Sequence, residues 1–199
     1  MKCRQPVDEG ADDRVSCATK GDLYMENGRI HIYCGDGKGK TTAAVGLAVR
    51  ASGSGKKVLF LQFLKGEESG ERQALRLLPG VTVYPNPEHI KFSFQMTEAE
   101  KDEVRADNDH RFKDAAIEAI EKGCDLLILD EAIGALQTEL LSRALVLFYL
   151  RTKPKGLEIV LTGRDPDQEL MELADYISEV KKLRHPFDQG EQARQGIEW

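Results

Sequence analysis

The sequence predicts an α/β fold with a mostly parallel sheet and helices on both faces. Short apolar runs alternate along the chain with longer segments of helical spacing, which is the order of strand–helix–strand units. The runs at residues 58–63 and 125–131 are apolar almost throughout, as strands covered on both faces are. Ligands of such folds bind at the carboxyl ends of the strands.

Each strand is predicted from its composition and from the turn residues that bound it. The last one alternates apolar with charged residues, which is typical of an exposed or edge strand. The strands are expected at residues 29–34, 58–63, 81–84, 125–131, 157–161 and 176–183.

The helices are predicted from apolar spacing and from capping residues. Thr97 and Glu100 have capping-box spacing, and Phe112, Ala116 and Ile120 mark the buried stripe of the helix that follows. Asp165-Pro166-Asp167-Gln168 is interpreted as an N-cap at Asp165 with proline at the first helical position and Gln closing a capping box. The expected helices run from residue 40 to a glycine-rich stop at 52–55, and over residues 71–78, 97–122, about 137–150, and 165–175.

Length and charge limit the kind of protein. The 199 residues suit one α/β domain at 28–199, preceded by a polar, flexible tail at 1–27. The net charge of −6 predicts no nucleic-acid or acidic-membrane partner, so an anionic ligand needs a local site. The chain shows no secretory signal and no apolar run of the ~20 residues that span a bilayer, and its four cysteines form no C-x-x-C pair. We therefore expect a cytoplasmic protein.

A glycine-rich loop, Gly35-Asp36-Gly37-Lys38-Gly39-Lys40-Thr41-Thr42, separates the first strand from the first helix. In that context, backbone N–H groups and the helix N-terminus converge on an anion, Lys40 adds a positive charge, and Thr41 offers a hydroxyl to Mg²⁺. The usual pattern is G-x-x-x-x-G-K-[ST]; here Cys34 stands at the first glycine, so the loop is one residue short. A glycine-rich turn without a ligand is the alternative.

Two further motifs fall at the same predicted edge of the sheet. An apolar strand ends in Asp130-Glu131, which would place a carboxylate beside Mg²⁺. Many strands end in acidic residues, but together with the loop the pair predicts Mg-nucleotide binding in a three-layer P-loop NTPase-like (RecA-like) fold. Arg164, after the strand at 157–161, is either a bidentate phosphate contact or a surface residue at a helix start. Lys65 and Arg50 are weaker candidates for a phosphate contact.

The residues alone do not identify the acceptor. The sequence shows no Ser-His-Asp set, no cluster of Cys and His, and no separate pair of carboxylates. Transfer of part of a nucleotide requires mainly positioning and electrostatics from the protein. The prediction from the residues therefore stops at a protein that binds MgATP or MgGTP and transfers part of it.

The chain resembles the P-loop-type ATP:corrinoid adenosyltransferases, which act on cob(I)alamin or cob(I)yrinic acid a,c-diamide. The shortened loop and the pattern H-x-F-D-x-G…Q-x-G-I-[DE]-aromatic at the end are specific to that family. The likeness covers about residue 28 to the end and rests on residues 35–44, 58–66, 129–131, 161–164, 185–190 and 193–199.

The resemblance implies transfer of the 5′-deoxyadenosyl group of ATP to the Co(I) of a reduced corrinoid, with release of triphosphate, in adenosylcobalamin biosynthesis or salvage. It implies catalytic roles for Lys40, Thr41 and Glu131, and Mg²⁺ ligands among Thr41, Asp130 and Glu131. The implied ATP-binding residues are Gly35, Asp36, Gly37, Lys38, Gly39, Lys40, Thr41, Thr42 and Arg164.

For the corrinoid, the resemblance assigns Phe92 and Phe94. The family has Phe-Thr-Trp pressing on the corrinoid face, where this chain has Phe92-Ser93-Phe94; the alternative is that both rings are core residues. The resemblance also implies a tail that covers the corrinoid, a homodimer, and a cobalt-reducing flavoprotein as partner. Two other functions stay open: a P-loop ATPase or small-molecule kinase that cleaves the β–γ bond, and a binding protein without turnover.

Overall fold

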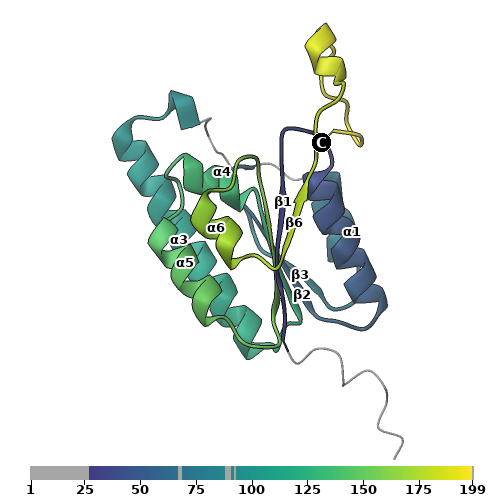
Figure 1. Ribbon diagram of the computed structural model, residues 1–199, viewed down its shortest axis with the longest axis vertical. Coiled ribbons are helices and arrows are strands. Elements are labelled where there is room, and N and C mark those ends of the chain that lie inside the picture. The colour runs from purple at the N-terminus through teal and green to yellow at the C-terminus, as the bar shows by residue number, and fades with distance from the viewer. Residues whose placement is uncertain (1–26, 67–68, 88–90, 92, 199) are drawn as a thin grey trace, which may run out of the picture.

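The computed structural model describes residues 27–66, 69–87, 91 and 93–198 (Figure 1). The predicted tail at residues 1–27 therefore lies outside the described residues, apart from Asn27. Phe92 also lies outside them.

A six-stranded parallel sheet forms the centre of the fold, in the order β3-β2-β4-β5-β1-β6. Each neighbouring pair of strands is parallel. The prediction of an α/β fold with a parallel sheet is thus confirmed, as is the edge position of the last strand. The strands are β1 Ile30–Cys34, β2 Val58–Gln62, β3 Val81–Val83, β4 Leu126–Asp130, β5 Glu158–Thr162 and β6 Tyr176–Glu179.

Helices cover both faces of the sheet, as Figure 1 shows for α1 on one side and α3 to α6 on the other. On the first face, α1 and α2 bury Ala44, Ala48 and Leu75 against the central strands. On the second face, the apolar sides of α3 to α6 form the larger core. The helices are α1 Lys40–Gly53, α2 Gly70–Arg76, α3 Glu98–Glu121, α4 Ala132–Gln137, α5 Arg143–Thr152 and α6 Gln168–Leu173, with 3₁₀ turns at η1 Ser93–Gln95 and η2 Pro186–Gln189.

The single helix predicted at about 137–150 is wrong. The chain forms α4 and α5 instead, and the turn between them buries Leu140 and Leu141 completely or nearly so. Ser142 begins the second helix: its side chain accepts a hydrogen bond from Leu145 N, and its own N–H donates to Asp109 Oδ1 at 2.7 Å. Burial of the two leucines and this cap together break the helix.

Two smaller predictions also need correction, while the capping box at Thr97 and Glu100 is confirmed. Asp167, not Asp165, is the N-cap of α6, because its carboxylate accepts a hydrogen bond from Leu170 N at 3.0 Å. Ile120 is 56% exposed, so this part of the predicted stripe is wrong. The buried residues of α3 are Asn108, Arg111, Phe112, Ala115, Ala116 and Ala119. The buried residues lie in the second half of this long helix, and its first turns extend beyond the core.

The carboxyl ends of the parallel strands lie together at one edge, the upper edge in Figure 1. The loops after β1, β2, β4 and β5 therefore meet there, as predicted. Among the described residues, no helix is both long enough and apolar enough to cross a bilayer.

We expect Gly163→Ala to destabilise the fold, because this glycine has a φ of +154° and an added Cβ would lie 2.5 Å from Ile133 Cβ. The strained backbone and the overlap together should lower the free energy of unfolding by about 2–4 kcal/mol. Urea unfolding measures the loss.

The matched control for that variant is Gly46→Ala in α1. Among the described residues, no atom lies within 4 Å of a Cβ added there. Replacing this exposed helical glycine should stabilise the protein by about 0.5–1 kcal/mol. Equal unfolding energies for the two variants would contradict the argument.

Candidate functional site

The glycine-rich loop turns sharply from β1 into α1. Gly35 and Gly39 have φ values of +104° and +123°, which side chains other than glycine rarely adopt. The first intrahelical bond runs from Ala43 N to Gly39 O, at 2.8 Å. A helix leaves the N–H groups of its first turn without intrahelical acceptors, so those of Lys40 to Thr42 are available to an anion.

The segment after β6 forms hydrogen bonds with the glycine-rich loop. Val180 O accepts a hydrogen bond from Gly37 N at 2.8 Å, and Asp36 Oδ1 accepts one from Lys182 N at 2.9 Å. The latter bond holds the pKa of the Asp36 carboxyl below its ordinary value. A Cβ on Gly35 would lie 2.4 Å from Val180 O, so this glycine also permits close packing. The sequence contained no signal for this support.

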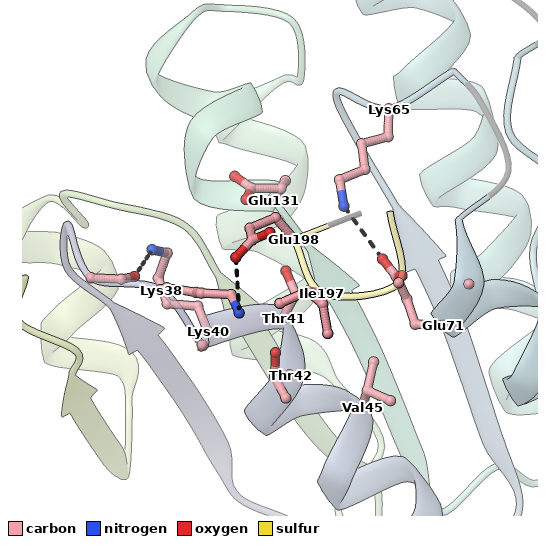
Figure 2. Close-up of a pocket in the computed structure, with 14 residues that line it drawn as sticks. Lys38, Lys40, Thr41, Thr42, Val45, Lys65, Glu71, Glu131, Ile197 and Glu198 are labelled. Atoms are coloured by element: carbon pink, nitrogen blue, oxygen red, sulfur yellow. Dashed lines mark hydrogen bonds and ion pairs between the residues drawn. The ribbon is translucent and has the colours of Figure 1, made fainter. Parts of the chain in front are cut away.

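A cavity of about 480 Å³ lies in front of the loop. Lys38, Lys40 and Lys65 contribute three positive charges to its lining, and the Lys40 ammonium donates to Gly37 O at 2.8 Å. Figure 2 shows these side chains around the cavity. The lining residues are Gly37, Lys38, Gly39, Lys40, Thr41, Thr42, Val45, Lys65, Gly70, Glu71, Glu131, Gly196, Ile197 and Glu198.

Asp130 lies under the cavity and is completely buried. Its Oδ1 accepts hydrogen bonds from the hydroxyls of Thr41 at 2.9 Å and Thr162 at 2.7 Å, and its Oδ2 accepts one from Gln62 Nε2 at 2.8 Å. Because Thr41 donates its proton to Asp130, the lone pairs of its oxygen are left for a cation. Asp130 therefore orients the threonine hydroxyl.

Glu131, by contrast, lines the cavity itself. Its φ of +58° is left-handed, and Thr162 Oγ1 accepts a hydrogen bond from its N–H at 2.9 Å. Burial first, and then the charge of Asp130, raise the pKa of the Glu131 carboxyl, although Lys40 and Lys65 act against that shift. Strained backbone of this kind concentrates at functional sites.

The oxygens of Thr41 and Glu131 are of the kind that Mg²⁺ prefers. In the part of the chain that the structure describes, no group of three or more His, Cys, Asp or Glu side chains could hold a metal ion alone. Mg²⁺ commonly keeps several waters and binds one or two protein groups plus substrate phosphates. The residues present therefore fit a magnesium ion that arrives with a nucleotide.

Two ion pairs complete the walls of the cavity. Lys65 pairs with Glu71 of α2 at 3.3 Å, and Lys38 pairs with Glu198 near the C-terminus at 3.7 Å. Hydrogen bonds from Arg194 hold Glu198 and lower the pKa of its carboxyl to about 2. No sequence motif marks Glu71, whereas Glu198 belongs to the family-like ending at residues 193–199.

Some predicted site residues lie outside the cavity lining. Arg164 is exposed; its carbonyl accepts from Gly35 N at 2.9 Å, and its positive charge slightly opposes the raised pKa of Glu131. Gly35 and Asp36 belong to the glycine-rich loop but do not line the cavity; they form hydrogen bonds with Arg164 O and Lys182 N. Phe94, in η1, is 80% exposed, so it is not a core residue.

Comparison with known proteins finds one matching family model, relatives of similar sequence and solved structures of similar fold. The profile of the family "ATP:corrinoid adenosyltransferase BtuR/CobO/CobP" matches residues 26–199. A corrinoid adenosyltransferase of Escherichia coli K12 is 33% identical over 202 residues, covering 98% of this chain and 95% of that protein. The corrinoid adenosyltransferase CobA of Salmonella typhimurium is 33% identical over 197 residues, with the same coverage. A KaiC-like protein from Pyrococcus horikoshii superposes with a TM-score of 0.46 at 14% identity, covering 80% of this chain and 75% of the other.

We expect Glu131→Gln to stabilise the protein without ligand at neutral pH. The folded state raises the pKa of this carboxyl, so its ionised form opposes folding. That cost is absent below the ordinary glutamate pKa of about 4.3 and grows as the pH rises through the raised value. Thermal unfolding between pH 4 and 8 should show a gain over wild type that vanishes toward acid.

The same variant removes a negative charge from the cavity and should bind MgATP about 10- to 100-fold more weakly, as loss of a group that supports a metal site typically does. Glu191→Gln, on the exposed C-terminal segment, serves as the control and should change neither quantity. A Glu131→Gln protein that follows the wild-type pH profile of stability would contradict the prediction.

Proposed function

The chain belongs to the ATP:corrinoid adenosyltransferase family and is a corrinoid adenosyltransferase; from this premise we propose that the loop Gly35–Thr42 holds the triphosphate of ATP as a leaving group. The observation that carries the proposal is the lining of the cavity. Lys38, Lys40 and Lys65 line one cavity together with Thr41 and Glu131, at the N-terminus of α1. This arrangement suits a chain of phosphates with a bound cation.

The transfer places few chemical demands on the protein. The electron pair of Co(I) attacks the C5′ carbon of ATP, the Co–C bond forms, and the C5′–O bond breaks. Both electrons of the broken bond leave with the triphosphate, and the cobalt becomes Co(III). Since the corrinoid brings the nucleophile, the task of the protein residues is to stabilise the charge that develops on the leaving group.

The side chains divide this task. The Lys40 ammonium, which donates to Gly37 O, would turn to the phosphates, and the N–H groups of the first turn of α1 would bind the phosphate oxygens. Thr41 and Glu131 would hold Mg²⁺, with Asp130 fixing the threonine hydroxyl. When bound there, Mg²⁺ would neutralise part of the triphosphate charge.

ATP hydrolysis is the competing activity, because Glu131 lines the cavity and its carboxylate is of the kind that activates a water. An ATPase or kinase would produce ADP by cleaving the β–γ bond. The proposal predicts triphosphate instead, formed only with reduced corrinoid. ADP and orthophosphate as the main products would overturn it.

The remaining assignments rest on the family resemblance. We propose that Phe92 and Phe94 contact the corrinoid and that Arg164 makes a further nucleotide contact. The tail at residues 1–27 would cover the corrinoid, a flavoprotein would reduce the cobalt, and the protein would act as a homodimer. A cytoplasmic location is supported by the four cysteines, which form no C-x-x-C pair.

We expect Lys40→Ala to slow adenosyl transfer severely. Removing one charged contact to the leaving group should cost about 2–4 kcal/mol of transition-state stabilisation, or about 30- to 900-fold in rate. Triphosphate release and the corrinoid absorption spectrum measure the rate. Lys122→Ala, at the exposed end of α3, is the control with unchanged kinetics, and wild-type rates in Lys40→Ala would show that the loop is not the triphosphate site.

Phe94→Ala should raise the KM for reduced corrinoid about tenfold, as truncation of an aromatic anchor does, and leave the KM for ATP unchanged. Because the ring is 80% exposed, the unfolding energy should change by less than about 0.5 kcal/mol. Phe94→Trp keeps an aromatic face and should retain corrinoid binding. If alanine and tryptophan variants share the wild-type KM, the ring does not touch the corrinoid.

A further inference from the structure

The C-terminal turn, residues 194–198, lies against the cavity that the glycine-rich loop forms. Gly196, Ile197 and Glu198 belong to the lining of that cavity. Two backbone hydrogen bonds close the turn, because Ile197 N and Glu198 N both donate to Arg194 O, at 3.2 and 3.0 Å. Figure 1 shows the carboxyl terminus beside the start of α1, and Figure 2 shows Glu198 facing Lys38. The end of the chain therefore returns to the phosphate loop.

Within the turn, Arg194 fixes the carboxylate of Glu198. Oε2 of the glutamate accepts hydrogen bonds from Arg194 N at 2.9 Å and Nε at 3.2 Å, and Oε1 accepts one from Nη2 at 3.0 Å. Because these bonds lower the pKa of the Glu198 carboxyl to about 2, the group is ionised at neutral pH. The turn thus brings a negative charge to the cavity wall beside the lysines of the loop.

The ion pair between Glu198 and Lys38 is loose. Lys38 Nζ lies 3.7 Å from Glu198 Oε1, beyond the usual limit of about 3.2 Å for a hydrogen bond, and the lysine side chain is 47% exposed. Exposed ion pairs contribute little to stability. A phosphate oxygen can accept a short, charge-assisted hydrogen bond from an ammonium group, at about 2.7–2.9 Å. A triphosphate, with its several negative charges, is therefore the stronger partner for Lys38.

The segment that leads to the turn can move at small cost. Residues 186–197 are all exposed, and Ile197, the one apolar side chain that the turn brings to the cavity, is 56% exposed. Burial of apolar area is the main stabilising contribution in folded proteins, and segments with little of it open readily. Exchange of partners at Lys38 therefore does not require a change in the core.

We infer that Glu198 competes with the triphosphate for Lys38, so that the C-terminal turn leaves the loop when phosphates bind and returns as the product departs. This inference rests on the proposed function, since it takes the loop as the triphosphate site. After transfer, the leaving group still carries all three phosphates, and the loop retains it. A tethered carboxylate that regains Lys38 lowers the affinity for this product and so assists its release.

The test is the affinity for magnesium tripolyphosphate, measured by isothermal titration calorimetry. Glu198→Gln keeps an oxygen that can accept from Arg194 but removes the charge, so it should bind tripolyphosphate about three- to tenfold more tightly than wild type. A gain in affinity is not the result that a damaged structure would give. Glu191→Gln removes the same charge from the same exposed segment, outside the cavity lining, and should match wild type.

A double-mutant cycle with Lys38→Ala separates competition for this lysine from general charge repulsion. If Glu198 acts through Lys38, Glu198→Gln should change the affinity by less than about twofold in the Lys38→Ala background. Equal tightening in both backgrounds would show that the carboxylate only repels the phosphates, and would overturn the inference. Unchanged or weaker binding of tripolyphosphate by the single variant Glu198→Gln would overturn it as well.

Lys40→Ala distinguishes this failure from failure of the proposed function. If Lys40→Ala binds tripolyphosphate more weakly than wild type and Glu198→Gln binds it equally well, only the role of Glu198 is wrong. If Lys40→Ala binds tripolyphosphate as wild type does, the loop is not the triphosphate site, and the inference fails together with the proposed function.

Discussion

The buried carboxylate of Asp130 holds the site together. It accepts hydrogen bonds from Thr41 of α1, Thr162 of β5 and Gln62 of β2, three elements that are far apart in the sequence. A completely buried carboxyl group without hydrogen-bond partners would be costly in this interior, so the three donors must stay in place as long as the protein is folded. The phosphate loop is thereby fixed relative to the sheet edge. The left-handed Glu131 follows from the same constraint, because its N–H is bound to Thr162 as well.

Local patterns were sufficient to predict most of the architecture. Apolar runs bounded by glycine and proline located the six strands, and the order of strand, glycine-rich loop and helix at Gly35 is as predicted. The break between α4 and α5 was missed because Leu140 and Leu141 continue the apolar spacing of a helix while in fact filling the core from a turn. The cap of α6 was misplaced by two residues because Asp165 and Asp167 are equally good caps in sequence.

The site was only partly predictable, for a physical reason. The motifs that contain Lys40, Thr41 and the pair Asp130-Glu131 are contiguous in the chain, so their spacing predicts their chemistry. Glu71 and the segment after β6 contact the site from other parts of the chain, and no local motif marks them. The exposure of Phe94 is likewise a property of packing: composition allowed a core residue, and the 3₁₀ turn η1 leaves the ring at the surface.

The packing of the loop against the segment after β6 bears on how the protein is made. Strand β1 pairs only with β5 and β6 among the described strands, and both belong to the last quarter of the chain. During synthesis, the glycine loop thus leaves the ribosome long before the strands that flank it and the carbonyl that binds Gly37 N. A nascent chain therefore acquires the strands that flank this loop, and the hydrogen bond to Gly37 N, only near the end of translation.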